Sequence, residues 1–370
     1  MITQDFDILV IGAGMAGSTA AAHLAPHRRV ALIEAEEAPG YHTTGRSAAT
    51  WILNYGPPDV RVLNALSLPF LLHPPPGFTQ HALTRPRPVL TVAPEDQREA
   101  LARMIETATD MRPIAVDTAY AMLPAMRRDY LAAAAIEDAA DLDVAAIQQG
   151  FLRQLRAAGG VLALRARAGR IERRAGLWEV ETAAGAIFRA PVVVNAAGSW
   201  GDEVAAIAGV TPLGLTPCRR TAAIIDPAPH DPEDWPMVMD AAGTWYARPE
   251  ARTRLMVSPA DETPMYPHDV QPDELDIAIG IDRMQQALDI EVRRVERSWA
   301  GLRTFTPDHS LAFGWDTAAE GFFWCVGQGG YGIQTSPAAG QLVADLVLGR
   351  DPGAAGEIVA AIDPQRFATV

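Results

Sequence analysis

The stretch from Asp7 to Ser18 constrains this chain most, because it predicts a strand, a tight turn and a helix in immediate succession. An apolar run ends at Gly12, and an alanine-rich helical pattern follows Gly17, with Gly14 between them. In such a G-x-G-x-x-G pattern the first glycine allows the turn, the second leaves room for a pyrophosphate, and the third lets the helix pack on the strand. The free N–H groups at the start of the helix favour phosphate oxygens. The stretch therefore predicts a dinucleotide-binding βαβ unit.

A second apolar run, residues 29–34, ends in an acid at the position that this unit requires. Glu34 lies 22 residues after Gly12, where such folds place the carboxylate that accepts hydrogen bonds from a ribose. A lone glycine triplet also arises in ordinary turns, but here strand, helix, second strand and acid follow in order. Nicotinamide and flavin dinucleotides share this motif, so the residues after Glu34 must decide between them.

Four further segments carry a resemblance. They are residues 40–49 (GYHTTGRSAA), 195–200 (NAAGSW), 299–303 (WAGLR) and 327–336 (GQGGYGIQTS). Together they resemble flavin amine oxidoreductases of the D-amino-acid oxidase superfamily, and most of all D-arginine dehydrogenase and its relatives. The resemblance implies an α/β fold: a Rossmann-like FAD-binding domain of the glutathione-reductase type, with a second α+β substrate domain on an antiparallel or mixed sheet.

The same resemblance assigns residues to the FAD site. Backbone groups near Ala168 are expected at the adenine, and His42 is expected to support the cofactor. The glycine-rich turn 327–334 enters a helix predicted over 336–348, whose N–H groups and dipole can stabilise the anion formed when flavin is reduced. The assigned cofactor residues are Gly12, Gly14, Met15, Ala16, Gly17, Glu34, Ala35, Thr43, Thr44, Arg46, Ser47, Ala48, Ala168, Ala197, Gly198, Trp200, Gly301, Gly329, Gly330, Tyr331, Gly332, Ile333 and Gln334.

Cysteines and acids give no pattern of a metal site. Cys218 and Cys325 lie far apart, which disfavours both a disulfide framework and a zinc site. Some relatives tether the flavin through a cysteine, but Cys325 lies in an apolar strand pattern and is interpreted as a buried structural thiol, so FAD is expected to bind non-covalently. Asp141 and Asp143 precede a predicted helix, and one of them is expected to cap it.

The chain is expected to alternate between the two domains. Prolines between residues 57 and 93 favour extended structure and predict the crossing into the substrate domain, which begins with a strand at 89–92. Helices are predicted over 95–108, 144–157 and near 273–289. The predicted FAD-binding domain comprises residues 1–80, 141–215 and 300–370, and the predicted substrate domain comprises 81–140 and 216–299.

The charge of the chain restricts its partners. The chain has 31 arginines, no lysine and 45 acidic residues, and the resulting net charge of −14 disfavours nucleic acid and anionic membrane as partners. The first strand follows the N-terminus after a few residues, leaving no room for a signal peptide, and no apolar run reaches the roughly 20 residues of a membrane span. We therefore expect a cytoplasmic protein, with peripheral membrane attachment left open.

Two arginines are candidates for binding a substrate carboxylate, because a planar guanidinium fork binds a carboxylate in a bidentate manner. Arg303 lies among apolar residues, where a lone cation needs an anionic partner. Arg303 and Arg220 match the carboxylate-binding arginines of the resembling enzymes, whereas Arg219 is interpreted as a surface residue. Tyr246 and Tyr55 match tyrosines of the same site.

The departures from the resembling enzymes predict a different substrate. Their preference for arginine depends on an acid, and the corresponding position here is Val89, which cannot compensate the desolvation of a guanidinium. The segment 50–53 replaces a polar, histidine-containing pattern and leaves no obvious base for the amine proton. The methionines add adaptable apolar surface. The predicted substrate pocket is formed by Thr50, Val89, Met237, Met239, Gly330 and Gln334.

The leading hypothesis is FAD-dependent oxidation of an apolar or cyclic D-amino acid to an imino acid, which hydrolyses to a 2-oxo acid and ammonia. The electron acceptor, whether a quinone, a dye-like acceptor or dioxygen, stays open. One alternative is oxidation of an N-alkyl or cyclic amine, or of a 2-hydroxy acid. Another is a non-catalytic flavin-fold binding protein, similar to the Rab GDP-dissociation inhibitors.

Overall fold

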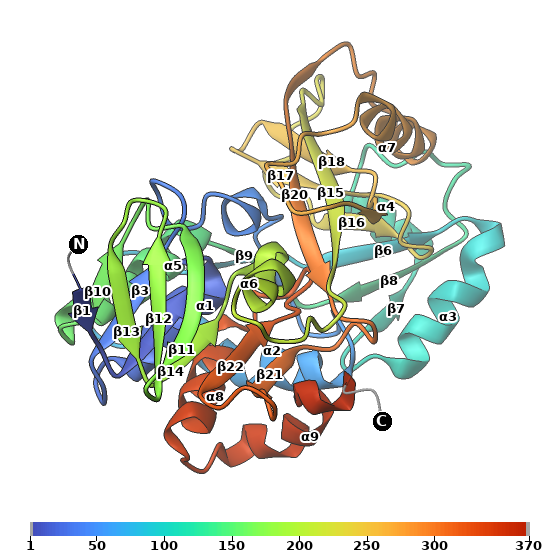
Figure 1. The fold of residues 1–370 in the computed structure, drawn as a ribbon. Helices are drawn as coiled ribbons and strands as arrows, with labels where there is room; N and C mark the ends of the chain where they lie inside the picture. Colours follow the sequence, from blue (N-terminus) through green and yellow to red (C-terminus); the bar gives the residue numbers. More distant parts are fainter. Residues whose placement is uncertain (1–2, 368–370) are drawn as a thin grey trace.

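Residues 3–367 are described by the structure, a computed structural model, and they form an α/β protein with two parts built on different sheets (Figure 1). The first part is centred on a six-stranded sheet in which every adjacent pair is parallel except β22 and β21. In spatial order its strands are β10 (Val161–Ala163), β3 (Val30–Ile33), β2 (Ile8–Ile11), β14 (Val192–Asn195), β22 (Phe322–Val326) and β21 (Ala312–Trp315).

The strands of this sheet are apolar throughout because both faces are covered. In β2, Ile8 and Val10 pack in the cluster formed with the helices, whereas Leu9 and Ile11 pack on the opposite face. The helices are α1 (Met15–Leu24), α2 (Pro58–Leu72), α5 (Val144–Ala157), α8 (Ser336–Leu348) and the short α9 (Val359–Ile362). The opposite face is covered by α6 (Gly201–Ile207) and a four-stranded sheet, in order β1 (Thr3–Asp5), β13 (Ile187–Ala190), β12 (Leu177–Thr182) and β11 (Ala168–Arg174).

The second part is built on a nine-stranded mixed sheet. Only β16 and β6 pair in parallel within it. Its path is β19 (Thr263–Pro264), β15 (Thr216–Ile225), β18 (Arg254–Ser258), β17 (Tyr246–Glu250), β16 (Met237–Asp240), β6 (Val89–Ala93), β8 (Ala133–Glu137) and β7 (Arg112–Ile114), and β20 (Val295–Phe305) pairs with β15. The helices here are α3 (Arg98–Thr107), α4 (Val116–Met122) and α7 (Glu274–Ala287). A three-stranded sheet of β4 (Thr50–Ile52), β9 (Ala139–Leu142) and β5 (Thr84–Pro86) completes the fold.

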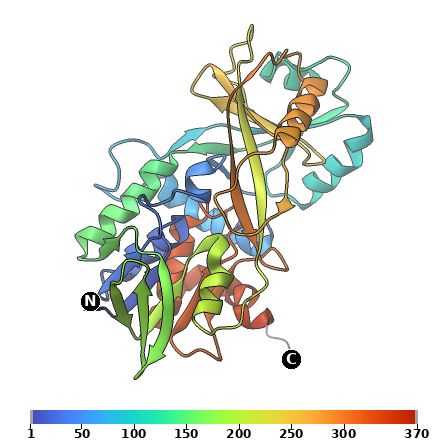
Figure 2. The same cartoon turned by 45° about the horizontal axis from the view of Figure 1, so that its top comes forward.

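The long strands β15 and β20 connect the two parts. They run antiparallel from the pair Thr216–Phe305 to the pair Ile225–Val295, and Figure 2 shows them extending from the first part to the far end of the second. At the near end, Thr304 of β20 forms a bridge with Gly329 of the glycine-rich turn before α8. The substrate-side sheet is thus attached directly to the turn that was assigned to the cofactor.

Most predicted elements are confirmed. The helices predicted over 144–157 and 336–348 coincide with α5 and α8, and those near 95–108 and 273–289 correspond to α3 and α7. Asp143 caps α5 by accepting a hydrogen bond from the Ala146 N–H at 2.8 Å. Cys325 is buried, and burial raises the pKa of its thiol to about 12, as expected for an unreactive structural thiol. No helix within residues 3–367 is long and apolar enough to cross a membrane.

One expectation was wrong. The proline-rich stretch after residue 57 is not extended throughout, because α2 occupies residues 58–72. Pro57 and Pro58 lie at its start, where a missing N–H costs nothing, and Pro69 lies in its last turn. Of the two acids considered as caps, Asp143 is the one that caps α5; Asp141 lies in β9, and its carboxylate accepts from Arg87 at 2.5 Å and from Arg248 at 3.0 Å.

Candidate active site

A cavity of about 460 Å³ extends from the carboxyl ends of β2 and β3 to the face of the nine-stranded sheet. Ile11 and Ile33, the last residues of those two strands, line one end of it, and Met237 and Tyr246 line the other. In open parallel sheets, ligands bind in the crevice outside the carboxyl ends of the strands. The cavity therefore lies where the βαβ unit is expected to bind a dinucleotide.

The three glycines of the first turn have different surroundings. Gly12 has φ +101°, and a Cβ atom there would lie 2.6 Å from the Ala196 carbonyl oxygen. A Cβ atom at Gly17 would lie 1.9 Å from the Gly12 carbonyl oxygen, so this position tolerates no side chain. At Gly14 the nearest atom would be Thr44 Oγ1 at 3.5 Å, and Gly14 lines the cavity. The first and third glycines thus serve close packing, and the second leaves open space for a ligand.

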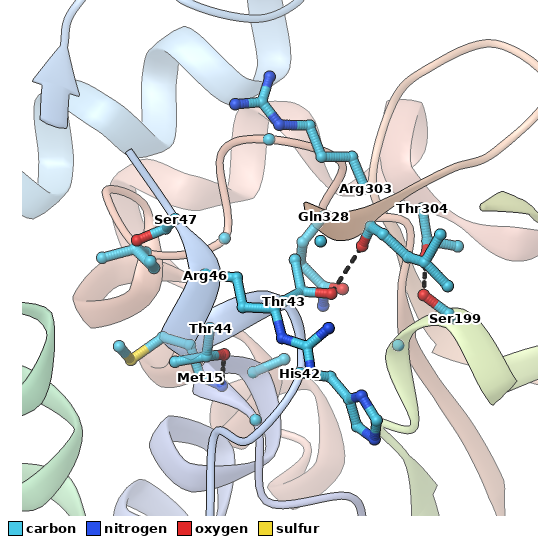
Figure 3. Close-up of a pocket in the computed structure, with 18 of the residues that line it drawn as sticks. Met15, His42, Thr43, Thr44, Arg46, Ser47, Ser199, Arg303, Thr304 and Gln328 are labelled. Atoms are coloured by element: carbon cyan, nitrogen blue, oxygen red, sulfur yellow. Dashed lines mark hydrogen bonds between the residues drawn. The ribbon is translucent and has the colours of Figure 1, made fainter. Parts of the chain in front are cut away.

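Polar groups at this end of the cavity hold the loop after β3. Glu34 accepts hydrogen bonds from the N–H groups of Ala13 at 2.7 Å and Glu36 at 3.0 Å. Thr44 accepts from the Met15 N–H at 3.0 Å, at the start of α1 (Figure 3). These contacts keep a carboxylate at the end of β3 and leave the helix N-terminus facing the cavity.

Residues 43–46 join the two parts of the molecule. The Thr43 hydroxyl donates to the Leu302 carbonyl at 2.6 Å. Arg46, with a largely buried side chain, donates to the carbonyl groups of Val270 and Ala300 at 3.1 Å each and forms an ion pair with Asp269. In Figure 3 the Arg46 guanidinium points toward His42, whereas Arg303 extends in the opposite direction.

Nearly all residues assigned to the cofactor line this single cavity. The exceptions are Gly17, which is a packing residue, and Tyr331, which is buried and donates its hydroxyl to the His309 carbonyl at 2.9 Å. The assigned residues that do line it are Gly12, Gly14, Met15, Ala16, Glu34, Ala35, Thr43, Thr44, Arg46, Ser47, Ala48, Ala168, Ala197, Gly198, Trp200, Gly301, Gly329, Gly330, Gly332, Ile333 and Gln334. The open position at Gly14, the carboxylate of Glu34 and the length of this lining fit an extended dinucleotide.

At the other end of the cavity, Arg303 is held by a tyrosine. Its Nη1 donates to the Tyr55 hydroxyl at 2.7 Å. Within residues 3–367 no carboxylate lies within ion-pair distance of Arg303, although many other arginines have one. A Cβ atom at Gly330 would lie 3.0 Å from Arg303 Nη1, so the glycine turn before α8 also contacts this cation. Arg303 thus faces the cavity without an anionic partner among the described residues.

The second predicted arginine, Arg220, lines the same cavity but already has partners. Its Nη2 forms an ion pair with Glu262 at 2.6 Å, and its Nε donates to the Asp261 carbonyl at 2.7 Å. Tyr246 is buried beside both arginines: burial raises the pKa of its phenol, but the charges of Arg303 and Arg220 outweigh this and leave the pKa below its ordinary value.

Other predicted pocket residues fall into two groups. Thr50, Met237, Met239, Gly330 and Gln334 line the cavity. Gln334 is almost fully buried, and its amide accepts from the N–H and donates to the carbonyl of Ile52. Val89 does not line the cavity: it is fully buried in one cluster with Met237 and Tyr246, which do. The prediction that Val89 contacts the substrate is therefore wrong, because other side chains form the wall.

Comparison with known proteins decides the family. Residues 7–346 match the family described as "FAD dependent oxidoreductase". The chain belongs to this family. Its fold is similar to glycine oxidase from Geobacillus kaustophilus (TM-score 0.81, 21% identity, 94% of this chain and 95% of that one). It is also similar to L-proline dehydrogenase from P. horikoshii (TM-score 0.85, 21% identity, 99% of both chains).

Curated relatives of this FAD-dependent oxidoreductase are matched over a shorter stretch. "FAD-dependent oxidoreductase domain-containing protein 1" of Xenopus laevis is 27% identical over 180 residues, which are 42% of this chain and 34% of the relative. The Bos taurus protein of the same name is also 27% identical over 180 residues, 42% of this chain and 35% of the relative. The match thus spans about a third of the length of these relatives. The matched family is broader than D-arginine dehydrogenase.

Sequence reasoning misjudged or missed several side chains of this FAD-dependent oxidoreductase. Arg219 is not a surface residue: its side chain is 12% exposed and pairs with Asp261 and Asp276. Glu262, which lines the cavity, was missed. It lies in a proline-flanked turn without any motif, and only the pairing of β19 with β15 brings it to Arg220. No local sequence signal could have identified it.

Proposed function

We propose that this FAD-dependent oxidoreductase oxidises an apolar or cyclic D-amino acid to the imino acid, which water then converts to a 2-oxo acid and ammonia. One observation carries the proposal: Arg303 presents a partly buried guanidinium to the cavity with Tyr55 as its hydrogen-bond partner and no carboxylate partner among the described residues. A buried cation without an anion is costly, and a bidentate carboxylate supplies two charge-assisted hydrogen bonds.

FAD, bound non-covalently in the cavity, would supply the two-electron acceptor for the reaction. The chain's own part is to position the substrate. Arg303 holds the carboxylate, and the phenols of Tyr55 and Tyr246 lie beside that cation and add hydrogen-bond donors. The N–H groups of the turn before α8 and the start of that helix present positive charge to the cavity.

The side-chain preference is inferred from the wall of the cavity. Met237, Met239 and Met256 line it together with Ile52, and flexible methionines adapt to apolar ligands of different shapes. Glu262, the acid that lines this end of the cavity, is already paired with Arg220, and its neighbour Asp261 is paired with Arg219. An apolar substituent is therefore favoured over a cationic one, for a reason that replaces the earlier argument from Val89.

Relatives of similar fold act on related compounds: their names include glycine oxidase, L-proline dehydrogenase and an L-amino acid deaminase from Proteus vulgaris. These names support an amino-acid substrate, and they leave the L-configuration and secondary amines as competing assignments. The D-configuration rests on the resemblance of the segments 299–303 and 327–336 to D-amino-acid enzymes.

The test is anaerobic reduction of the purified holoprotein, followed as bleaching of its flavin absorbance. The panel contains matched D- and L-forms of leucine, methionine, phenylalanine and arginine, together with glycine, sarcosine, proline and 2-hydroxy acids. We expect fast bleaching by apolar D-amino acids. Bleaching by L-forms or secondary amines alone would replace the assignment, and bleaching by D-arginine above D-leucine would contradict the side-chain preference. Re-oxidation in air, compared with a quinone or a dye, identifies the acceptor.

A further inference from the structure

The substrate end of the cavity contains two cations and one anion. Arg220, Arg303 and Glu262 all line it, and the other predicted pocket residues that line this end carry no charge. If every charge in this group is to be balanced by an opposite charge, the group can accept one more negative charge, which a ligand would supply. The number of carboxylates that a ligand carries is therefore a property that the site can discriminate.

The two arginines differ in what they can offer a ligand. Arg220 uses Nη2 for Glu262 at 2.6 Å and Nε for the Asp261 carbonyl at 2.7 Å, and its side chain is 13% exposed. The Arg303 guanidinium makes one side-chain hydrogen bond among the described residues, to the Tyr55 hydroxyl. A carboxylate from the protein thus occupies the position at Arg220 that a second ligand carboxylate would need.

Glu262 lies in a turn that hydrogen bonds and ion pairs attach to the neighbouring sheet. The neighbouring Asp261 accepts hydrogen bonds from the N–H of Thr221 at 2.6 Å and from its hydroxyl at 3.0 Å. Asp261 also pairs with Arg219, whose Nη2 forms a further ion pair with Asp276 at 2.5 Å. These contacts fix the backbone of residues 261–262 to β15, the strand that carries Arg220. The backbone on both sides of the pair is therefore held by the sheet, while the Glu262 side chain itself is 47% exposed.

We propose that Glu262 is a specificity-determining residue, which occupies Arg220 and restricts the site to ligands with a single carboxylate. A second carboxylate on a ligand would meet the like charge of Glu262 and would have to displace it from Arg220. This inference rests on the proposed function in one respect, that Arg303 binds a carboxylate. It predicts poor binding of D-aspartate, D-glutamate and iminodiacetate.

The test compares ligands of equal length in the holoprotein and its Glu262→Gln variant. Propionate and malonate form one pair, butyrate and succinate the other, and each is titrated by its perturbation of the flavin absorbance. In the parent the dicarboxylate should bind more weakly than its monocarboxylate. In Glu262→Gln the ratio of the two dissociation constants should shift by about tenfold toward the dicarboxylate, because one charge-assisted hydrogen bond becomes available.

Two variants make the result specific. Glu250→Gln alters the matched pair Arg248–Glu250, at 2.8 Å with a 10% exposed arginine, outside the cavity lining, and it should leave the ratio unchanged. The double variant Arg220→Met, Glu262→Gln should lose the gain, because the released cation is gone.

An unchanged ratio in Glu262→Gln overturns the inference, while amino-acid bleaching in the parent still supports the proposed function. Selective loss of D-arginine turnover in Glu262→Gln also overturns it, because Glu262 would then bind cationic side chains. If none of these four ligands changes the flavin absorbance of the parent or of any variant, the inference fails. Anaerobic bleaching by amino acids then decides separately on the proposed function.

Discussion

At the scale of single residues, Arg303 is the side chain on which the proposed function depends most. Its guanidinium faces an apolar cavity with one tyrosine hydroxyl as partner. Replacing it by methionine keeps the length of the side chain and removes the charge. We expect Arg303→Met to raise KM for the amino acid at least about a hundredfold, since a charge-assisted bidentate contact contributes about 3 kcal/mol. The visible spectrum of the bound flavin should not change.

Arg303→Lys is the control for this prediction, because lysine keeps the charge and loses the planar fork. It should recover part of the affinity, as measured by KM in steady-state turnover. Equal KM values in the parent and in Arg303→Met would remove Arg303 from the substrate site.

Residue roles that depend on sequence neighbours could be predicted, and those that depend on pairing across the sheet could not. The apolar neighbours of Arg303 in the sequence indicated a cation shielded from solvent, and in the structure its partly buried side chain lines the cavity. Arg219 and Arg220 are adjacent, and both are tied to the turn at residues 261–262 through the β15–β19 register. No local pattern reports that register, so the acids of this turn were missed.

At the scale of elements, the first βαβ turn separates a packing role from a binding role. A Cβ atom at Gly14 would meet only Thr44 Oγ1 at 3.5 Å, whereas one at Gly17 would lie 1.9 Å from a backbone oxygen. We expect Gly14→Ala to fold normally and to weaken FAD binding at least about tenfold, because its methyl group enters the space left for phosphates. Gly17→Ala should instead lower the melting temperature or prevent folding.

Reconstitution of the apoprotein with FAD, together with thermal melting, measures both effects. Tight FAD binding by Gly14→Ala would mean that the phosphates lie elsewhere. Normal stability of Gly17→Ala would show that α1 can move away from β2 at little cost.

Helix α1 also contains a partly buried histidine, with a fully buried Nε2 atom, that makes stability depend on pH. The ring of His23 packs 5.7 Å from that of Phe151, its Nε2 has no hydrogen-bond partner among the described residues, and burial lowers its pKa from 6.5 to about 4. The folded state therefore binds this proton more weakly than the unfolded state. The contribution of His23 is complete above pH 6.5 and is lost as the pH falls toward 4, by about 2 kcal/mol between pH 7 and pH 4.5.

His23→Leu tests this by removing the titrating group and keeping an apolar side chain. Between pH 7 and pH 4.5 its melting temperature should fall by a few degrees less than that of the parent. Replacing the exposed His81 by leucine is the control and should leave the pH dependence as it is. The same drop in the parent and in His23→Leu would assign acid sensitivity to other groups.

Helix α2 shows where element prediction from sequence has its limit. Prolines exclude a helix only in its interior, and two of the three prolines in this region lie at the helix start. The remainder of α2 is apolar enough to pack in the main cluster through Val60, Leu63 and Leu71. Position within the helix, rather than the number of prolines, decided the structure.

At the scale of the whole molecule, the site exists only because distant segments converge. The parallel sheet takes strands from residues 8–33, 161–195 and 312–326, and the substrate end of the cavity is added by β15, β16 and β17. The glycine motifs predicted the parallel sheet, and the resemblance implied the second sheet, which carries the substrate end of the cavity. The exact domain boundaries stay a prediction, because β15 and β20 extend through both parts without a break.

The last prediction concerns the connection between the two parts. Arg46 joins residues 43–46 to the 265–271 loop and to β20 through the carbonyl groups of Val270 and Ala300 and the carboxylate of Asp269. Arg46→Met removes these three contacts while the Trp299 Nε1 bond to the Arg46 carbonyl remains. We expect FAD binding to weaken about tenfold and the melting temperature to fall, since such largely buried charged hydrogen bonds contribute about 1–3 kcal/mol each.

Arg46 lines the cavity itself, so a direct contact with FAD would give the same loss, and Asp269 separates the two explanations. Asp269 does not line the cavity; it contacts two residues that do, Arg46 through an ion pair and Tyr41 through a hydrogen bond at 3.4 Å, and asparagine at position 269 keeps an oxygen that can accept from Tyr41. If Arg46 acts by joining the two parts, Asp269→Asn must weaken FAD binding in the same direction by a smaller factor. The exposed pair Arg85–Asp234 supplies the control Arg85→Met, which should change neither quantity. Full FAD affinity in Asp269→Asn with a large loss in Arg46→Met would assign Arg46 to the cofactor alone.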